Sequence, residues 1–481
     1  MLFNSYIFLF MFLPLCLLVY YWCNHQGFYR AGLIVLIGMS FWFYAYNHVS
    51  YLLLLVASIL GNWLLSRILV NIEFKKRKLL LLVGIVANIL VIFYYKYLGF
   101  TIFNINRLAG TSITVEDIIL PLGISFYTFQ QVSFLVDSYR RETEGYQFID
   151  YAAFVSFFPQ LVAGPIVLHQ EMIPQFRQID RKKFSYDALA SGLYLLAVGL
   201  FKKVILADTF GKAVSWGFEH VPDLSSLEII LIMLFYTFQI YFDFSGYSDM
   251  AIGIAKMFRI DIPHNFNSPY KACSIIEFWN RWHMTLTRFL RQYIYYPLGG
   301  NRKGKIRTYI NIFLVFVVSG IWHGARWTFI LWGMLHGVAN ILNRIFKKYW
   351  DRCHVAFQWI CTFIFVSIGW LIFRADSVFQ AYDLIKRMIR LDTWQIHLDF
   401  YYCFHLAEFN YLKGIGPIVN SVAGFWMWFF VAVALFISLN MTDVAEKKFK
   451  PTVGRMLGTV VLLFWSIISL SGISTFLYFN F

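Results

Sequence analysis

Long apolar segments follow one another along almost the whole chain, and each is close to the length that a helix needs to cross a bilayer. A spanning helix takes about 20 mostly apolar residues. Eleven segments meet this description, near residues 6–22, 31–46, 51–70, 79–99, 187–206, 226–242, 308–323, 326–346, 355–374, 424–440 and 456–478. Only 14% of the residues are charged, against about 25% in soluble domains. The sequence therefore predicts an all-α membrane protein that crosses the bilayer many times.

Three further segments are apolar but are interrupted by proline, glycine or charged residues. They lie near residues 118–137, 150–168 and 271–297. Irregular backbone at membrane depth is tolerated where it is buried in protein or lines a wet cavity. We therefore expect these segments to form re-entrant or interfacial helices.

The expected organisation is one membrane domain over residues 1–481. N-terminal helices fill residues 1–110, a core that carries the polar motifs fills 113–345, and C-terminal helices fill 355–481. An exposed, aromatic-rich loop near 377–420 is a candidate docking site for a partner protein. The first apolar segment lacks a basic stretch before it and a small-residue cleavage site after it, so we expect a permanent span.

The formal net charge is +15, and its distribution predicts which side of the membrane each loop faces. The run KKRK at residues 75–78 lies between the third and fourth segments. An excess of Lys and Arg in short loops marks the cytoplasmic side, so we expect the N-terminus outside. A second basic group, Arg302, Lys303 and Lys305, has two interpretations. It orients the chain and contacts anionic lipid, or it attracts an anionic cytosolic substrate such as a phosphate-bearing acyl donor.

Ionisable residues interrupt the aromatic stretch YTFQIYFDFSGYSDMAIG, residues 236–253. Charged groups inside membrane spans are costly and are candidates for function. Asp243 and Asp249 therefore need partners, for which the basic groups of the chain are available. Two interpretations stay open: a helix end held by buried hydrogen bonds, or, with Gln239, the lining of a polar tunnel.

A second polar stretch, residues 275–305, reads IIEFWNRWHMTLTRFLRQYIYYPLGGNRKGK. On one helix, Asn280, His283 and Thr287 share a face, since about 3.6 residues make a turn. An interfacial amphipathic helix explains the arginines and aromatic residues of this stretch. It explains the pairing of Asn280 with His283 less well.

A third stretch, VVSGIWHGARWTF, residues 317–329, places His323 between Trp322 and a glycine, and His336 follows 13 positions later. On one unbroken helix these two histidines would point in different directions. Gly320 and Gly324 allow the backbone to bend or a neighbouring segment to approach closely. A histidine in such a setting is either a hydrogen-bonded helix contact or a functional group.

Imidazole suits general-base catalysis near neutral pH, because its unperturbed pKa is about 6.5. Acyl transfer from a thioester to a hydroxyl needs such a base, but no metal and no covalent nucleophile. The sequence holds no HxxxH and no GxSxG pattern, and its six cysteines form no CxxC pair. We therefore expect no metal, no cofactor and no nucleic-acid partner, and we interpret the cysteines as small buried hydrophobic residues.

Several of these motifs together resemble the membrane-bound O-acyltransferase family, in the bacterial branch that O-acetylates alginate or peptidoglycan. The resemblance rests on FWNRWHMTLTRFLRQYIYYPLGG and VVSGIWHGARWTFILWGMLHG, and on the N-terminal stretch MLFNSYIFLFMFLPL. It also rests on PLGISFYTFQQVSFLVDSYRR, FFPQLVAGPI and YFDFSGYSDMAIG. It covers the chain up to about residue 345 and is weaker beyond.

The resemblance implies a fold and a site. The fold is a ring of membrane helices around a thin core with a central tunnel. His323 matches the catalytic histidine of the family, and His283 matches its second histidine. Asn280, Trp282 and Trp322 are expected beside the substrate, together with Asp243 and Gln239. The resemblance assigns no role to His336.

The resemblance also implies acetyl transfer in the bacterial inner membrane. The acetyl group would come from a cytosolic thioester such as acetyl-CoA. It would pass outward, by way of an extracytoplasmic SGNH-hydrolase-like acetyltransferase, to alginate, peptidoglycan or another surface polymer. Two other hypotheses stay open: a channel or exporter without chemistry of its own, and a structural anchor for a separate transferase.

Overall fold

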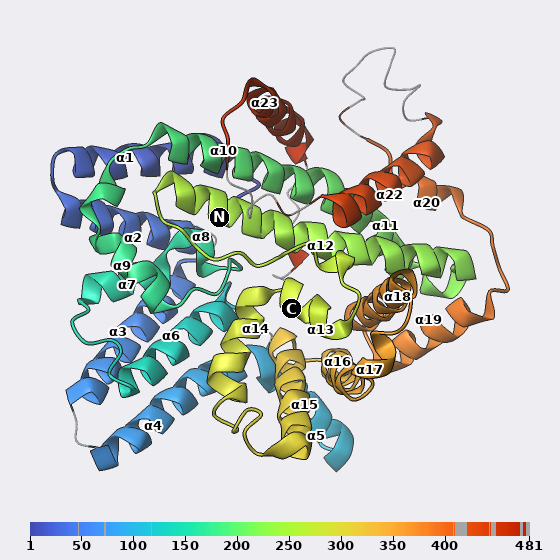
Figure 1. Ribbon diagram of the computed structural model, residues 1–481, viewed down its shortest axis with the longest axis horizontal. Helices are drawn as coiled ribbons and strands as arrows, with labels where there is room; N and C mark the ends of the chain where they lie inside the picture. The colour runs from blue at the N-terminus through green and yellow to red at the C-terminus, as the bar shows by residue number, and fades with distance from the viewer. Residues whose placement is uncertain are drawn as a thin grey trace. The chain divides into compact units, whose positions relative to one another are not determined.

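A computed structural model describes residues 1–46, 48–71, 74–116, 118–406, 408, 421–441, 443, 449–471 and 475–477. These residues form helices joined by turns and loops, and no strand occurs among them (Figure 1). The all-α prediction is therefore confirmed. The ring of helices with a central tunnel and the single membrane domain stay predictions. Contacts within the chain define two compact units.

The first unit comprises Met1–Leu196 and Met250–Pro263. Its helices, with single turns of π or 3-10 type labelled η, are η1 (Phe8–Phe12), α1 (Leu13–His25), α2 (Tyr29–Ala45), α3 (Val49–Asn71), α4 (Phe74–Ile92), η2 (Phe93–Tyr97), α5 (Leu98–Ala109), α6 (Ile124–Tyr139), α7 (Phe148–Ser156), α8 (Phe158–Leu161), α9 (His169–Arg177) and η3 (Ile179–Lys182). Helices α3 and α4 pack against α6, most of whose side chains are buried.

The second unit comprises Ala197–Asp249 and His264–Phe481. Two helices, α10 (Tyr186–Leu200) and α12 (Ser226–Met257), contribute residues to both units. The other helices are η4 (Phe201–Ala207), α11 (Asp208–Glu219), η5 (Val221–Asp223), η6 (Pro269–Lys271), α13 (Ile275–Arg281), α14 (Met284–Leu290), η7 (Arg291–Tyr295), α15 (Gly304–His323), α16 (Trp327–Ile345), α17 (Lys347–Trp350), α18 (Val355–Arg374), α19 (Val378–Arg390), α20 (Leu398–Tyr402), α22 (Ala423–Asn440), α23 (Val453–Ile468) and η10 (Ser469–Ser471).

Seven helices in the described residues are long and apolar enough to cross a membrane: Phe8–His25, Val49–Asn71, Lys76–Ala109, Tyr186–Glu219, Ser226–Met257, Gly304–His323 and Val355–Arg374. Three shorter apolar helices, Tyr29–Ala45, Gly424–Asn440 and Val453–Ile468, fall on further predicted spans. The segment predicted at 326–346 forms α16. The protein is thus a multi-pass membrane protein, whereas the total of eleven spans stays a prediction.

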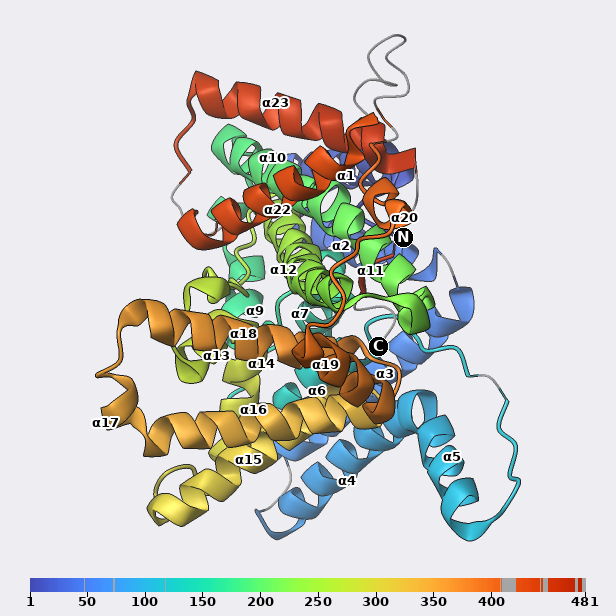
Figure 2. The same cartoon turned by 90° about the vertical axis from the view of Figure 1, so that its right-hand side faces the viewer.

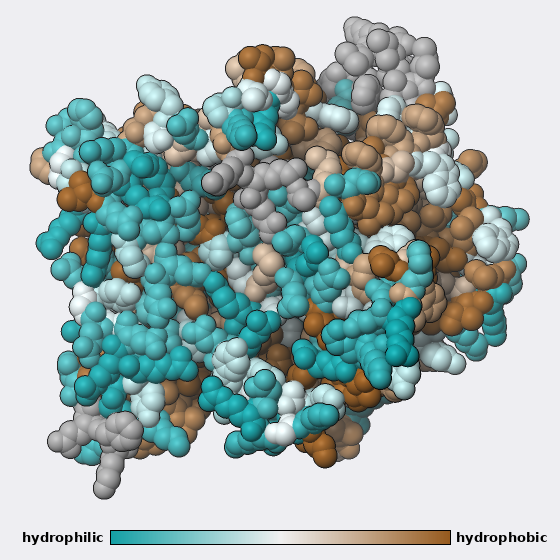
Figure 3. Space-filling view, viewed as in Figure 1, coloured by the Kyte–Doolittle hydropathy of each residue, from teal (hydrophilic) through white to brown (hydrophobic). Residues whose placement is uncertain are grey.

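Some helices run further than their apolar segments suggested. The segment predicted at 226–242 continues to Met257. The helix continues past Asp243 and Asp249 because lysine side chains neutralise both carboxylates, as described below. Apolar side chains gather on the surface over α22 (Figure 3), where Phe425, Trp428 and Phe436 are exposed. Such a surface suits contact with lipid.

Helices α15 and α16 pack closely against each other, and α16 lies between α15 and α18 (Figure 2). A Cβ atom added at Gly320 would overlap the backbone oxygen of Phe329, and it would lie 3.2 Å from the Cα atom of Gly333. Small residues allow membrane helices to approach in this way. The expectation that Gly320 permits close approach of a neighbour is therefore confirmed.

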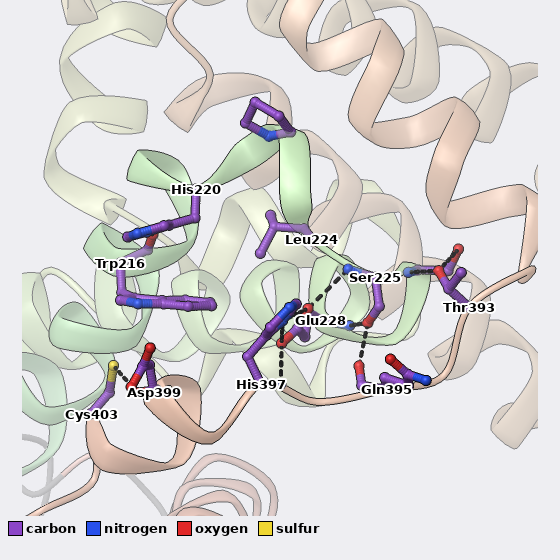
Figure 4. Close-up of polar contacts among 12 residues, drawn as sticks. Trp216, His220, Leu224, Ser225, Glu228, Thr393, Gln395, His397, Asp399 and Cys403 are labelled. Carbon is purple, nitrogen blue, oxygen red and sulfur yellow. Dashed lines mark hydrogen bonds and ion pairs between the residues drawn. The ribbon is translucent and has the colours of Figure 1, made fainter.

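A buried carboxylate joins the start of α12 to the segment before α20 (Figure 4). Glu228 is fully buried and accepts hydrogen bonds from the backbone N–H of Ser225, at 2.9 Å, and of His397, at 2.8 Å. The imidazole Nδ1 of His397 lies 2.8 Å from the same carboxylate. Acidic side chains stabilise a helix N-terminus, so Glu228 both caps α12 and anchors the segment that carries His397.

Candidate active site

The stretch that carries His283 is broken rather than continuous. Helix α13 ends at Arg281, Trp282 is extended, and His283 has a left-handed backbone with φ of 44° before α14 begins. The prediction that Asn280, His283 and Thr287 share one helical face is therefore wrong. The break arises because the preceding loop bonds to the backbone of this stretch: the N–H of Met284 donates to the backbone oxygen of Asn265 at 2.9 Å.

The imidazole of His283 is buried, with 1% of the residue exposed. Its Nδ1 lies 3.1 Å from the side-chain oxygen of Asn265, which also accepts from the hydroxyl of Thr285 at 2.8 Å. Its Nε2 has no hydrogen-bond partner among the described residues. Burial lowers the pKa of His283 to about 3, so the ring is neutral at physiological pH.

His323 is the last residue of α15 and is 5% exposed. Its ring is surrounded by aromatic side chains from three helices. The ring centroids lie 5.0 Å from Trp322, 5.2 Å from Trp332 on α16 and 5.3 Å from Phe373 on α18. This cage excludes water from the imidazole, which strengthens electrostatic interactions with any polar group that enters.

The two histidines meet at one tryptophan. The ring centroid of Trp322 lies 6.1 Å from that of His283 and 5.0 Å from that of His323. The fold thus brings together two histidines that are 40 positions apart in the sequence. These distances do not test the catalytic roles of the two histidines, which stay predictions.

The glycine beside His323 does not leave space for a substrate. A Cβ atom at Gly324 would overlap the ring of Phe329, so the room is filled by protein. The absence of a side chain at Gly324 instead allows the turn between α15 and α16 to fold against Phe329. Trp322 contacts the rings of both histidines, and its expected place beside the substrate stays a prediction.

A cavity of about 210 Å³ lies in the same unit, and neither His283 nor His323 is among its lining residues. Its wall is made by α13, α14, η7, α15 and α16, and its polar lining residues are Asn280, Thr287, Arg291, Ser319, Asn340 and Arg344. Ser319 precedes His323 by four residues on α15, so the two side chains lie on the same helix face. The cavity wall therefore reaches the helix turn below His323. Asn280 is a lining residue, and its contact with a substrate stays a prediction.

The other residues predicted at the site lie elsewhere in the unit. Trp282 packs against Trp370, with centroids 4.8 Å apart. Gln239 lies against Gly211, where an added Cβ would be 2.7 Å from its Nε2. Neither residue is part of the cavity wall.

The buried aspartates of α12 form ion pairs. The Nζ of Lys203 lies 2.7 Å from Asp243 and 2.8 Å from Asp208, and the Nζ of Lys202 lies 2.7 Å from Asp249. The expectation that lysines neutralise these aspartates is confirmed. The cavity wall does not contain them, so a tunnel lined by these aspartates has no support from the described cavity.

The basic group Arg302, Lys303 and Lys305 is exposed; Arg302 and Lys303 precede α15, and Lys305 lies in its first turn. It does not line the cavity, whereas Arg291 and Arg344 do. These two arginines were not predicted as site residues, because their surroundings resemble those of interfacial arginines. The cavity itself, built from five separate helices, has no signature in the sequence.

His336 has a structural partner. The indole N–H of Trp279 donates to its Nδ1 at 3.1 Å, and Trp332 and Phe365 pack on its ring. His336 is fully buried. It thus connects α16 to α13, which holds one wall of the cavity in place.

Within the described residues, one group of side chains has the composition of a metal site: Asp137, Glu142 and His169 in the first unit. His169 Nε2 lies 3.1 Å from Asp137. The group is separate in the sequence from the histidine motifs and contributes nothing to the cavity wall.

Comparison with known proteins assigns the chain to a family. A model of the membrane-bound O-acyltransferases matches residues 87–379, a range that contains both histidines and all of the cavity. The chain belongs to the membrane-bound O-acyltransferase family. It is therefore a multi-pass membrane O-acyltransferase.

Individual relatives of this O-acyltransferase include enzymes that modify bacterial surface polymers. The peptidoglycan O-acetyltransferase of Helicobacter pylori is 37% identical over 100% of this chain and 98% of its own. The probable alginate O-acetylase AlgI of Pseudomonas aeruginosa is 38% identical over 82% of this chain and 76% of its own. The teichoic acid D-alanyltransferase of Bacillus subtilis is 28% identical over 54% of this chain.

Proposed function

We propose that this O-acyltransferase moves an acetyl group from a cytosolic thioester, acetyl-CoA, toward a hydroxyl of a cell-surface or exported polysaccharide. The observation that carries the proposal is the pair of buried histidines whose rings both lie near Trp322. A cavity reaches the same helices, because its wall includes Ser319, one turn before His323, and Asn280, three residues before His283. Relatives that are named for O-acetylation of peptidoglycan and alginate support an acetyl group as the cargo.

In the proposed reaction His323 acts as the general base. One of its ring nitrogens takes the proton of the acceptor hydroxyl while the hydroxyl oxygen attacks the thioester carbonyl carbon. The carbon–sulfur bond then breaks, and the proton passes to the departing thiolate sulfur. The products are an oxygen ester and a free thiol. The thioester is already activated, so the reaction needs no cofactor, and the aromatic cage around His323 protects it from hydrolysis.

The proposed donor site is the cavity whose wall includes Asn280 and Ser319. Acetyl-CoA carries several phosphate groups, and guanidinium groups pair well with phosphate oxygens. Arg291 and Arg344 supply two such groups at the cavity wall, and the exposed loop with Arg302, Lys303 and Lys305 adds three positive charges. The acetyl end would lie near Ser319 and Asn280, close to the histidine pair.

The proposed orientation places the basic loops in the cytoplasm of a bacterium and the N-terminus outside its inner membrane. The loop before α15 and the residues after α16, which include Lys347 and Lys348, are both basic, which favours the cytoplasmic side. An extracytoplasmic SGNH-hydrolase-like acetyltransferase would then complete the transfer to polymer. Part of the predicted docking loop at 377–420, namely residues 407 and 409–420, lies outside the described residues.

Substitution of His323 tests the proposal directly. We expect purified His323→Ala to remain folded but to lose at least about 100-fold in acetyl transfer, as is typical for loss of a general base. Transfer is measured as base-labile radiolabelled acetate that membranes gain from acetyl-CoA. His25→Ala changes an exposed histidine at the end of α1 and serves as the matched control. Full activity of folded His323→Ala would refute the assignment of the base.

The competing hypothesis, passage of a substrate without chemistry, makes a different prediction. A channel would need polar groups along a path, whereas Asp243 and Asp249 are occupied by lysines. Acetate that becomes covalently attached in the presence of the purified protein excludes a channel. Transport that survives loss of both His283 and His323 would favour one.

A further inference from the structure

Asn265 is a buried side chain that no sequence motif marked as functional. It lies in the loop between α12 and α13 and is 1% exposed. Its side-chain oxygen accepts from the Thr285 hydroxyl at 2.8 Å and from the Thr285 backbone N–H at 3.4 Å, and it lies 3.1 Å from His283 Nδ1. Its backbone oxygen accepts from Met284 N–H. Asn265 therefore contacts the first two residues of α14 as well as the imidazole at the helix break.

The contacts of Asn265 fix the orientation of its amide. A backbone N–H can only donate, so the group that faces Thr285 N–H must be the amide oxygen. The reversed amide would place two donors against each other. Because an amide oxygen only accepts, the His283 Nδ1 that faces it must carry the proton.

The tautomer of His283 follows from this contact. The ring is neutral, so a proton on Nδ1 leaves Nε2 with a lone pair and no proton. This Nε2 is buried and has no hydrogen-bond partner among the described residues. A buried acceptor without a partner carries a substantial desolvation penalty, which a hydroxyl donor from a substrate would remove. A carbonyl oxygen or an oxyanion, which both need a donor, would not fit this atom.

We propose that Asn265 is a positioning residue that holds His283 in the Nδ1–H tautomer, so that its Nε2 accepts a hydrogen bond from the hydroxyl of the acyl acceptor. This inference rests on the proposed O-acyl transfer and narrows it. His283 binds and orients the attacking hydroxyl, and it does not stabilise the negative charge that develops on the thioester oxygen. A hydroxyl has one proton, so in the resting complex it donates to His283. As the hydroxyl oxygen attacks, the O–H bond turns about the C–O bond toward His323, which takes the proton.

Two substitutions at position 265 separate positioning from simple structural support. Asn265→Ala removes the acceptor, so the His283 ring can turn or change tautomer; we expect kcat to fall about tenfold or more with little change in the KM for acetyl-CoA. Asn265→Asp keeps an acceptor in place, so much of the activity should return at neutral and higher pH. The added carboxylate raises the pKa of His283, and the acid limb of the pH–kcat profile should move to higher pH.

A double substitution tests whether Asn265 acts through His283. If it does, Asn265→Ala should cause no further loss in a His283→Ala background. The matched control is Asn88→Ala, which removes a buried amide of the first unit that donates to Asn62 at 2.7 Å. All variants are measured in inverted membrane vesicles with radiolabelled acetyl-CoA, and rates are normalised to folded protein.

The outcomes distinguish this inference from the proposed function. An inactive wild-type protein in this assay would contradict the acetyl transfer itself. An active wild type with an unchanged Asn265→Ala would overturn only the role of Asn265. Equal losses in Asn265→Ala and Asn265→Asp, with the acid limb unmoved and effects additive to His283→Ala, would also overturn it, because that result describes a structural residue.

Discussion

At the scale of single residues, charge is handled differently in α12 and at the histidine pair. The carboxylates of Asp243 and Asp249 are neutralised by lysines at 2.7 Å, whereas His283 is buried in the neutral form with a hydrogen-bonded amide beside it. A buried ion pair is destabilising to break, because the remaining charge loses its partner without regaining water. The lysines at 202 and 203 therefore stabilise the fold, whereas His283 forms no ion pair among the described residues.

The charge arrangement predicts the effect of Lys203→Met. This substitution leaves Asp243 and Asp208 without their shared cation, and we expect a loss of about 3–5 kcal/mol of stability. The melting temperature of each variant is measured in detergent, with unfolding monitored by size-exclusion chromatography. Lys183→Met is the control, since its pair with Asp180 is exposed and spans 3.5 Å, and exposed pairs contribute about 0–1 kcal/mol. Equal melting temperatures of the two variants would contradict the assigned role of Lys203.

The residues of the site were predictable to different degrees. His283 and His323 were identifiable because imidazoles within apolar, aromatic stretches are rare and because both occur in recognisable motifs. Asn265 was not identifiable, since one asparagine in a polar loop has no distinguishing neighbour in the sequence. Its importance arises only when the loop folds back on the break at His283. Arg291 and Arg344 were hidden for a similar reason: they line one cavity although they lie on η7 and α16, which are far apart in the sequence.

At the scale of secondary-structure elements, the position of His323 depends on the contact between α15 and α16. The two helices touch through backbone atoms at Gly320 and Gly333, and the turn between them carries the histidine at its first end. Any side chain at this crossing would separate the helices. Separation of the helices would also break the ring contacts of His323 with Trp332 and Phe373.

We therefore expect Gly320→Ala to be destabilising by about 1–3 kcal/mol, the usual result of overpacking. Because the shift also moves His323, acetyl transfer per folded molecule should fall. Gly458→Ala in α23 is the matched control, because a Cβ there meets nothing within 4 Å and alanine favours the helix. Transfer rate and unfolding temperature are measured for both. A Gly320→Ala protein as stable and active as wild type would refute the close crossing.

The elements themselves were well predicted where the apolar pattern was long, and less well where local geometry decided. The break at His283 was missed because helical periodicity was extrapolated through residues that individually favour a helix. The backbone hydrogen bond from Met284 to the Asn265 loop overrides that preference. Helix α12 was predicted too short because its two aspartates suggested a helix end. The lysines that neutralise them come from another part of the chain and could not be assigned to them from the sequence.

At the scale of the whole molecule, hydropathy was sufficient to identify a multi-pass membrane protein and its all-α class. The exact number of spans does not follow, because several helices are short or strongly polar at one end. The sidedness of the chain rests on the basic loops. The basic group Arg302, Lys303 and Lys305 belongs to the same compact unit as the arginines at the cavity wall, so this unit gathers positive charge that suits a polyanionic donor.

Reversal of charge tests the role of these basic residues. We expect Arg291→Glu with Arg344→Glu to raise the KM for acetyl-CoA about tenfold or more, because a phosphate would then meet carboxylates. The triple change of Arg302, Lys303 and Lys305 to Glu should raise it about three- to tenfold and mainly at low salt, as expected for steering by exposed charges. Steady-state kinetics at two ionic strengths measure both. An unchanged KM in both variants would leave these residues as topology signals only.

The left-handed backbone at His283 has a consequence for how this position is maintained. A φ of 44° is adopted readily by glycine, whereas for a residue with a side chain it carries a conformational penalty of order 1 kcal/mol. On backbone conformation alone, glycine would be preferred at this position, whereas the proposed chemistry demands the imidazole. The backbone preference and the proposed catalytic requirement are therefore opposed at position 283. We expect a histidine to be kept there only where acyl transfer is under selection.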